Sequence, residues 1–201
     1  MLSVYRVLDL SDRVGWLAGR LLADLGADVI KVEAPGVNIE GADWQSYNVN
    51  KRLLRLDLAT SDGQQAFDRL IAGFDVLIES AQPGDPVART LGVERLKQIN
   101  PSLIHVSVTP FGSGGSRADW LASDIEMMAA GGAMSLAGEP EGTPMRVSVP
   151  QAYCWAGAQA AVGALMALLH RTVSGGRGQH VDVSAQAAVI LAVSHAPAFW
   201  D

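Results

Sequence analysis

The sequence lacks a second cysteine. Cys154 is the only cysteine among 201 residues, so no disulfide can form within the chain. Disulfides mark secreted and extracellular proteins, whereas a chain without them fits the reducing cytoplasm. Residues 1–19 also lack the basic stretch and the long apolar stretch of a signal peptide. We therefore predict a cytoplasmic protein.

Basic residues are also in short supply. The chain carries 15 Lys and Arg against 21 Asp and Glu, a net charge of −6 at pH 7. Proteins that bind nucleic acids usually carry a basic patch, so we predict no nucleic-acid partner. The four histidines are His105, His170, His180 and His195. Their spacing is not that of metal ligands, and we predict no metal site.

A strongly hydrophobic run of membrane length is missing. Residues 152–169 are almost uncharged, but they are mostly Ala and Gly and they include Gln159. Ala and Gly contribute little free energy to transfer into a membrane. The pattern therefore favours a buried helix over a membrane span, and we expect no membrane association.

Carboxylates are absent from residues 142–181. This gap contains the stretch QAYCWAG, residues 151–157, which opens a long helix rich in small residues. Cys154 stands in that stretch without a histidine nearby in sequence to activate its thiol. A packing role is therefore favoured over a nucleophilic one.

The chain does contain short apolar runs that alternate with helical patterns, as in a sheet with helices on both faces. Strands are predicted at 5–10, 28–33, 52–58, 75–80, 102–110 and at the end of 174–184. Helices are predicted at 16–27, 62–74, 93–100, 123–138, 151–171 and 185–200. We predict one α/β domain over residues 1–201, with a Rossmann-like, doubly wound, mostly parallel sheet and a helix-rich C-terminal part.

Ligands of such sheets bind at the carboxyl ends of the strands, which are followed here by loops 11–16, 34–41, 80–86 and 110–116. FGSGGS, residues 111–116, has the composition of a phosphate cradle but also that of a plain flexible turn. A G-x-G-x-x-G pattern does not follow the first strand, so a dinucleotide site is not predicted. Lys51 and Arg52 could pair with an anionic ligand or could be a solvated strand entry.

Five segments in order resemble the family III CoA-transferases, the group of formyl-CoA transferase and carnitine CoA-transferase. They are residues 17–36 (LAGRLLADLGADVIKVEAPG), 48–58 (NVNKRLLRLDL), 75–84 (DVLIESAQPG), 99–115 (INPSLIHVSVTPFGSGG) and 167–184 (ALLHRTVSGGRGQHVDVS). The resemblance implies a large α/β domain that binds coenzyme A or an acyl-CoA, with no covalently bound cofactor. It also implies an interlocked homodimer of chains about twice as long as this one.

The catalytic position departs from that family. Family members use an aspartate that attacks the acyl-CoA thioester and stands four residues before a glycine of the long helix. Here the glycine is Gly157, and Tyr153 occupies the aspartate position. A phenol has a pKa of about 10 and cannot form an acyl anhydride. The His–Asp pair of the related racemases falls at Ser123 and Tyr153, so we predict no catalytic residue.

The resemblance implies ten positions for contact with coenzyme A. They are Val14, Gly15, Trp16, Ala34, Lys51, Arg52, Ser80, Ala81, Arg89 and Thr90. Several differ from the family pattern: Ala34 replaces a basic residue, Ser80-Ala81 replaces Asn-Phe, and Thr90 replaces an arginine. The resemblance therefore implies a degenerate site.

Three hypotheses for function follow. The first is a supporting subunit in CoA transfer between an acyl-CoA and a carboxylic acid, inactive alone. It would depend on a homologous catalytic chain or a separate second-half chain in a homo- or hetero-oligomer. The alternatives are a non-catalytic acyl-CoA-binding or regulatory module, and an enzyme of altered chemistry in which Tyr153 acts as an acid or hydrogen-bond donor. The apolar helix at 185–200 is itself expected to need a partner.

Overall fold

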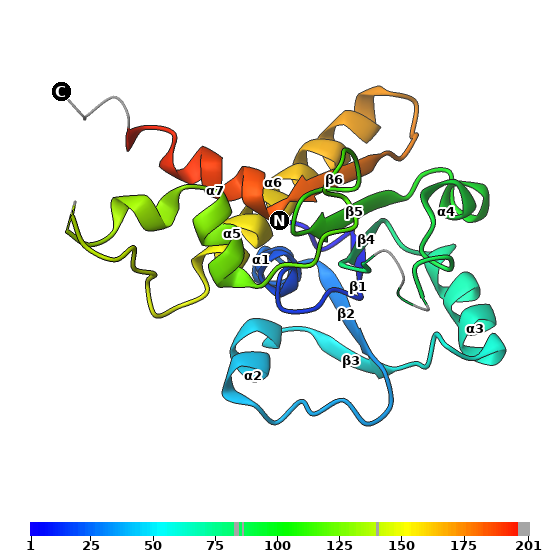
Figure 1. The fold of residues 1–201 in the computed structure, drawn as a ribbon. Coiled ribbons are helices and arrows are strands. Elements are labelled where there is room, and N and C mark those ends of the chain that lie inside the picture. The colour runs from blue at the N-terminus through cyan, green and yellow to red at the C-terminus, as the bar shows by residue number, and fades with distance from the viewer. Residues whose placement is uncertain (83–84, 86, 140, 197–201) are drawn as a thin grey trace.

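The computed structural model describes residues 1–82, 85, 87–139 and 141–196. Six strands form one sheet in the order β3-β2-β1-β4-β5-β6, and neighbouring strands all pair in parallel (Figure 1). The strands are β1 (Arg6–Asp9), β2 (Asp28–Glu33), β3 (Arg52–Arg55), β4 (Val76–Glu79), β5 (Ile104–Thr109) and β6 (His180–Ser184). The predicted Rossmann-like α/β sheet is confirmed.

Helices lie on both faces of this sheet. They are α1 (Trp16–Asp24), α2 (Ala42–Asn48), α3 (Ser61–Ile71), α4 (Val93–Ile99), α5 (Asp124–Ala130), the 3₁₀ helix η1 (Ala133–Leu136), α6 (Gln151–Val173) and α7 (Ala185–Val193). Helices α3 and α4 cover one face, whereas α1, α5, α6 and α7 cover the other (Figure 1). Helices α5, α6 and α7 make the C-terminal part helix-rich, as predicted.

Alternate side chains of the central strands feed two separate hydrophobic cores. Val7 and Ile78 belong to the core under α1 and α6, whereas Leu8 and Leu77 belong to the core under α3 and α4. Every residue of β4 and β5 is buried. A sheet covered by helices on both faces buries its central strands in this way, including the polar residues Glu79, His105 and Ser107.

Helix α6 fits against its neighbours through small residues. A Cβ built on Gly157 would lie 2.7 Å from the Cβ of Leu17 in α1, so only glycine permits this approach. Its buried face consists of Ala152, Ala156, Gly157, Ala160, Ala161, Ala164, Ala167 and Leu168. Within the described part of the chain, α6 is the one helix long and apolar enough to cross a membrane. The predicted buried helix agrees with the face that packs into the core.

One helix is shorter than predicted and one was not predicted. Residues 123–138 were expected to form a helix ending in a Gly-rich turn; the helix is α5, and the chain turns at Gly132, which takes a positive φ of 85°. Residues 133–136 then form η1. Helix α2 was missed, since ADWQSYN is short, polar and mostly exposed, and it offers no clear helical periodicity.

Other differences concern element ends. The strand predicted at 52–58 ends at Arg55, and the helix predicted at 16–27 ends at Asp24 before Gly26, whose φ is +97°. The helix predicted at 185–200 ends at Val193, and residues 197–200 of that prediction lie outside the described residues.

Candidate functional site

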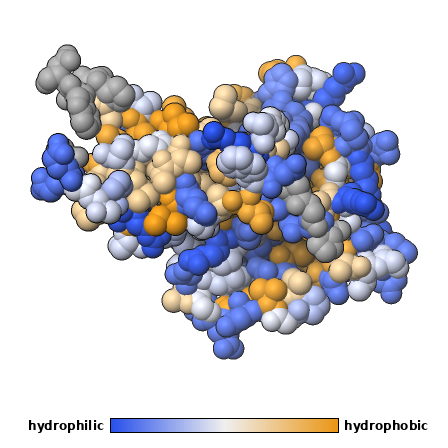
Figure 2. All heavy atoms as spheres, viewed as in Figure 1, coloured by the Kyte–Doolittle hydropathy of each residue, from blue (hydrophilic) through white to orange (hydrophobic). Residues whose placement is uncertain are grey.

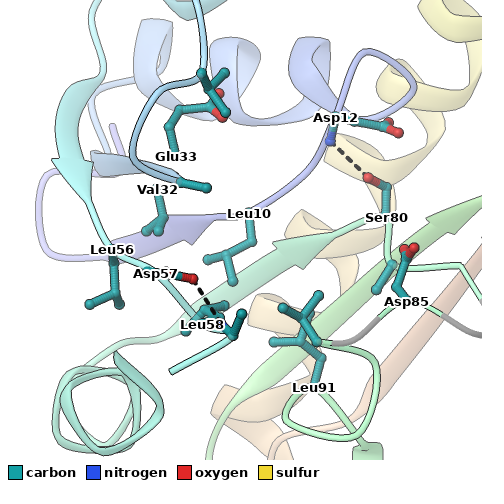
Figure 3. Close-up of a pocket in the computed structure, with 15 residues that line it drawn as sticks. Leu10, Asp12, Val32, Glu33, Leu56, Asp57, Leu58, Ser80, Asp85 and Leu91 are labelled. Atoms are coloured by element: carbon teal, nitrogen blue, oxygen red, sulfur yellow. Dashed lines mark hydrogen bonds between the residues drawn. The ribbon is translucent and has the colours of Figure 1, made fainter. Parts of the chain in front are cut away.

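The carboxyl ends of β1 to β4 surround a cavity of about 360 Å³ (Figure 3). β1 lies between β2 and β4. The chain adds β2 and β3 on one side of β1 and then β4, β5 and β6 on the other side, so the strand order changes direction at β1. Such a switch point is where doubly wound sheets bind ligands. The cavity is lined by Leu10, Asp12, Val32, Glu33, Ala34, Val37, Leu56, Asp57, Leu58, Ala59, Ser80, Ala81, Asp85, Val87 and Leu91.

A second cavity of about 250 Å³ adjoins the first, because Asp12 lines both. Its other lining residues are Arg13, Val14, Gln82, Pro110, Ala122, Met127 and Tyr153. A hydrogen bond of 2.7 Å from the backbone N of Asp12 to Ser80 Oγ ties the loop after β1 to the loop after β4. Asp12 therefore connects the linings of the two cavities.

Tyr153 brings a phenol to the smaller cavity from the first turn of α6. Burial raises the pKa of the Tyr153 hydroxyl, and the nearby carboxylates of Asp12 and Asp124 raise it further. The phenol is therefore neutral at physiological pH. It can donate a hydrogen bond to a ligand, but it offers no anionic oxygen for nucleophilic attack.

Two carboxylates that are distant in sequence lie close to Tyr153 in space. Asp124 Oδ1 accepts a hydrogen bond of 3.2 Å from the backbone N of Tyr153, and its Oδ2 lies 3.5 Å from Arg146 Nη1. This buried carboxylate thus caps the start of α6. Asp12 reaches the same cavity from the β1 loop, where its Oδ1 accepts a hydrogen bond from the backbone N of Val14. Sequence spacing around position 153 gave no signal for either residue.

Lys51 takes part in a buried ion network. Its Nζ lies 2.7 Å from Asp9 Oδ2, 2.8 Å from Asn48 Oδ1 and 2.9 Å from the carbonyl of Trp16. Neither the Lys51 nor the Asp9 side chain is exposed. These three acceptors use all three donors of the ammonium group, so Lys51 holds the segment before β3 to the end of β1.

Lys31 supports the same region from β2. Its side chain is 2% exposed, and its Nζ donates to the carbonyl of Ser11 at 2.6 Å. It also lies 3.4 Å from Glu33 Oε1 and 3.9 Å from Asp9 Oδ1. Two buried ammonium groups therefore surround one buried aspartate directly beneath the loop that lines both cavities.

Four of the ten predicted ligand positions line a cavity. Ala34, Ser80 and Ala81 line the larger one, and Val14 lines the smaller one. Their contact with coenzyme A stays a prediction.

Gly15 and Trp16 shape the loop between these positions. A Cβ on Gly15 would lie 2.6 Å from the Cβ of Ser11, so the turn requires glycine. Trp16 Nε1 donates to the carbonyl of Ser11 at 3.1 Å, and its ring packs 6.4 Å from that of Tyr47.

The structure does not bring the other four positions into the cavities. Lys51 is engaged as described, and Arg52 forms a two-pronged ion pair with Asp28 at the opposite end of the strands, with distances of 2.7 and 2.9 Å. Arg89 is exposed, and Thr90 is buried beside the larger cavity without lining it. The segment between Gln82 and Val87 includes residues 83, 84 and 86, which lie outside the described residues.

The glycine turn at 111–116 binds a carboxylate of the same chain, that of Asp182. The backbone N of Ser113 lies 2.9 and 3.1 Å from the two carboxylate oxygens of Asp182, and Ser113 Oγ donates to the same group at 2.6 Å. Gly112 and Gly115 take positive φ angles of 85° and 92° there. This turn closes β5 against β6.

The surroundings of Cys154 do not favour a nucleophilic role. Its Sγ lies 3.5 Å from the hydroxyl of Tyr47, and this hydrogen bond, together with burial, raises the pKa of Tyr47 to about 12. The pair joins α2 to α6 and fits the predicted packing role.

A buried polar row crosses the sheet below the site and was not predicted. Glu79 Oε1 lies 3.2 Å from His105 Nε2, the rings of His105 and His180 are 5.0 Å apart, and His180 Nε2 lies 2.6 Å from Ser107 Oγ. Within the described ranges, no three His, Cys, Asp or Glu side chains come together as in a metal site.

Fold and site together define an α/β protein with a ligand cavity at the switch point of a parallel sheet. A family model described as CoA-transferase family III matches residues 2–200. The chain belongs to the family III CoA-transferases, which confirms the resemblance stated from the sequence.

Curated relatives are mostly longer proteins. The chain is 36% identical to the succinyl-CoA:(R)-benzylsuccinate CoA-transferase subunit BbsE of Thauera aromatica, over 99% of this chain and 52% of that protein. It is also 36% identical to a succinate–glutarate CoA-transferase of Agrobacterium fabrum, over 91% of this chain and 50% of that protein. The chain thus spans about half the length of these relatives.

Solved structures support the fold. A CaiB/BaiF family protein from Brucella suis superposes with a TM-score of 0.91 at 31% identity, covering 99% of this chain and 57% of that one. The protein Rv3272 from Mycobacterium tuberculosis gives a TM-score of 0.87 at 30% identity, covering 98% of this chain and 58% of that one.

Proposed function

We propose that this chain is a supporting subunit in CoA transfer between an acyl-CoA and a carboxylic acid. It works in the cytoplasm beside a homologous chain, or a separate second-half chain, that supplies the nucleophilic aspartate. The observation that carries the proposal is the neutral phenol of Tyr153 in the smaller cavity at the start of α6. An acyl anhydride needs a carboxylate, and Tyr153 has none.

The surface supports the need for a partner. On α6, Val162, Met166, Leu169 and Val173 form one apolar face and are between 51% and 79% exposed. The neighbouring α7 exposes Ile190 and Leu191. A soluble protein that exposes a contiguous apolar face usually covers it with another chain. One of the relatives is itself named as a subunit of a CoA-transferase.

The test is a transferase assay with succinyl-CoA and a panel of dicarboxylic acids. The chain alone is expected to give no turnover above background, and addition of a homologous chain that carries the aspartate is expected to give turnover. Turnover by the purified chain alone would overturn the proposal.

Two variants separate the remaining sources of chemistry. Tyr153→Phe should leave the turnover of the mixed assembly within about twofold, because the hydroxyl does no chemistry in this scheme. A large loss would instead support the altered-chemistry hypothesis. Asp12→Asn tests the carboxylate that lines this cavity beside Tyr153. If the chain alone were active and Asp12→Asn abolished that activity, the nucleophile would be Asp12 and not a residue of a partner chain.

The larger cavity favours a second candidate function, a non-catalytic acyl-CoA-binding or regulatory module. Its volume and its position at the switch point suit a ligand whether or not chemistry follows. Calorimetry with an acyl-CoA, carried out with and without the catalytic chain, tests this function. A module of this kind would bind and yet leave the turnover of the catalytic chain unassisted.

A further inference from the structure

One nitrogen in the buried polar row of β4, β5 and β6 has no partner among the described residues. The side chains of His105 and Glu79 are 5% and 6% exposed, and His105 Nε2 lies 3.2 Å from Glu79 Oε1. The other ring nitrogen, His105 Nδ1, is buried and forms no hydrogen bond within the described part of the chain. A polar atom that is removed from water in this way is costly unless a partner reaches it.

The hydrogen bonds around Glu79 assign the proton of this pair. Glu79 Oε2 accepts a hydrogen bond of 2.6 Å from the backbone N of Ala81, and Glu79 Oε1 faces the ring of His105. A carboxylate only accepts, so His105 Nε2 carries the proton and donates it to Glu79. Nδ1 of the neutral imidazole is then bare, and it needs a donor.

A small cavity of about 10 Å³ borders His105 between α4 and the starts of β5 and β6. It is lined by Val93, Leu96, Lys97, Asn100, Leu103, His105, Gln179 and His180. A buried water needs about 10–15 Å³ and two to four polar partners. Hydrophilic residues predominate on the α3–α4 side of the molecule, behind which this cavity lies (Figure 2). The cavity therefore has the size and the polar lining for a single water molecule.

The lining residues offer a water further contacts but do not themselves reach His105 Nδ1. Lys97 Nζ uses one donor on Glu94 Oε1 at 2.9 Å and retains others. His180 Nε2 lies 2.6 Å from Ser107 Oγ, and its ring centre is 5.0 Å from that of His105. A molecule between these groups can donate to His105 on one side and contact Lys97 or His180 on the other.

The charges around the cavity favour a neutral occupant. Lys97 brings a positive charge to the lining, and no acidic residue is among the described lining residues. The carboxylate of Glu79 lies beyond the His105 ring, where both of its oxygens are engaged. Asp182, the acidic residue of β6, is held by Ser113. A cation would therefore meet repulsion without a carboxylate to bind it.

We propose that this cavity binds one water molecule, which donates to His105 Nδ1 and fixes His105 in the tautomer that donates to Glu79. The opposite tautomer would turn a lone pair of Nε2 toward the carboxylate. His105 and its water thereby position the loop after β4, because Glu79 holds the backbone N of Ala81 and Ala81 lines the larger cavity. This support is internal to the chain and does not depend on a ligand in the larger cavity.

Nitrogen-15 NMR of the whole chain reads the tautomer directly, at about pH 8, where an ordinary histidine is neutral. His105 is expected as a single Nε2–H tautomer whose Nδ1 has the chemical shift of a hydrogen-bonded acceptor. A high-resolution crystal structure should place a water about 2.7–3.2 Å from Nδ1. An Nδ1–H tautomer, or an Nδ1 that accepts no hydrogen bond, would overturn the inference. So would a shift of this signal on titration with ammonium chloride, because the occupant would then be a cation.

Two variants separate the roles of the two ring nitrogens. Counted in bonds from Cβ, the amide nitrogen of glutamine matches Nε2 of histidine, whereas the amide of asparagine matches Nδ1. His105→Gln therefore keeps a donor for Glu79, and His105→Asn removes it. Hydrogen exchange of the Ala81 amide should accelerate at least about tenfold in His105→Asn and less than about threefold in His105→Gln.

The amide of Leu10 is the internal control for this measurement. It donates to the carbonyl of Ile78 at 2.8 Å between the same ends of β1 and β4 and takes no part in the Glu79–His105 pair. Its exchange should stay within about twofold of the parent in both variants. Equal acceleration of Leu10 and Ala81 would indicate a general loosening, and unchanged exchange of Ala81 in His105→Asn would mean that His105 does not position the loop. Either result contradicts the inference. If His105→Asn does not fold, the nitrogen-15 signals of the parent chain still decide the matter.

Discussion

At the scale of single residues, Asp9 is a fully buried carboxylate that lies between two buried ammonium groups. Burial by itself would raise the pKa of its carboxyl, but the ammonium groups of Lys51 and Lys31 outweigh burial and hold that pKa below its ordinary value of 3.8. The carboxylate therefore contributes stability at pH values above 3.8, and that contribution is lost only as the pH falls further. At neutral pH the network is intact.

Asp9→Asn should destabilise the fold by about 3–5 kcal/mol at pH 7, because it leaves two buried ammonium groups without their counter-charge. Urea denaturation measures the change. Asp24→Asn, which breaks the partly exposed ion pair with Arg20, is the control and should hardly move the midpoint. Similar midpoints for the two variants would mean that the buried network does not stabilise the fold.

His180 gives the molecule a pH-dependent stability near neutrality. Burial lowers the pKa of its ring below the ordinary value of 6.5, His105 and Lys97 lower it further, and Asp182 and Glu79 oppose them. The unfolded chain thus binds a proton at a higher pH than the folded one, so the free energy of unfolding should decrease as the pH falls below about 6.5. Unfolding midpoints from pH 8 to pH 5 should show this decrease, and His180→Gln should flatten it. A decrease of the same size in His180→Gln would assign the effect to another group.

The candidate site shows which residue-level features a sequence can reveal. The resemblance to the family places Tyr153 at the aspartate position, because one position in a continuous motif is enough for such an assignment, and this assignment stays a prediction. Asp12 and Asp124 near Tyr153 could not be predicted, because the loop after β1, the start of α5 and the start of α6 come together only in the folded chain. Lys51 was expected to contact a ligand, but it is buried in an ion pair with Asp9. The sequence did not show this pairing, because Asp9 lies 42 positions earlier in the chain.

At the scale of elements, the crossing of α1 and α6 depends on a missing side chain. Gly157→Ala would place a methyl group 2.7 Å from the Cβ of Leu17 and 3.2 Å from the backbone N of Ala18. Neither neighbour is a flexible side-chain end, so the helices must separate, at a cost of about 1–3 kcal/mol despite the better helix propensity of alanine. Thermal unfolding is the measurement.

Gly41→Ala supplies the comparison for this prediction. Its φ is −63°, and a Cβ there would meet nothing within 4 Å. The unfolding temperature of this variant should stay within about 2 °C of the parent. If Gly157→Ala behaved in the same way, the two helices would not be in the tight contact described.

The elements themselves were largely predictable, for a physical reason. Strands such as β4 and β5 are buried on both faces, and their Val, Leu and Ile residues make short β-branched or Leu-rich runs that the sequence shows. Helix α2 could not be predicted from hydrophobic periodicity, because it lies next to α1 without burying an apolar stripe. The turn between α5 and η1 falls at the pair Gly131-Gly132, a signal that the sequence does show, and Gly132 takes a positive φ of 85° there.

At the scale of the whole molecule, the apolar faces of α6 and α7 should govern behaviour in solution. A groove of about 290 Å³ runs between these helices and β6 and is lined by Val162, Met166 and Leu191 among others. We expect the purified chain to associate with itself as its concentration rises. The variant Met166→Lys/Leu169→Lys should abolish this association, as measured by light scattering or sedimentation.

The same variant should also weaken binding to the catalytic chain, since we place the partner on this face. Val4→Lys changes an exposed apolar residue elsewhere on the surface and should affect neither measurement. If the double lysine variant still associated like the parent chain, another surface would have to hold the partner.

The order of the strands has a consequence for folding during synthesis on the ribosome. β5 lies between β4 and β6, yet Ser107 of β5 and its contact His180 of β6 are 73 positions apart. During synthesis the first five strands can assemble while β5 still offers an open edge of unpaired amides, the kind of edge that captures other chains. A nascent chain stalled before residue 180 should therefore bind chaperones, and one stalled well beyond Ser184 should release them.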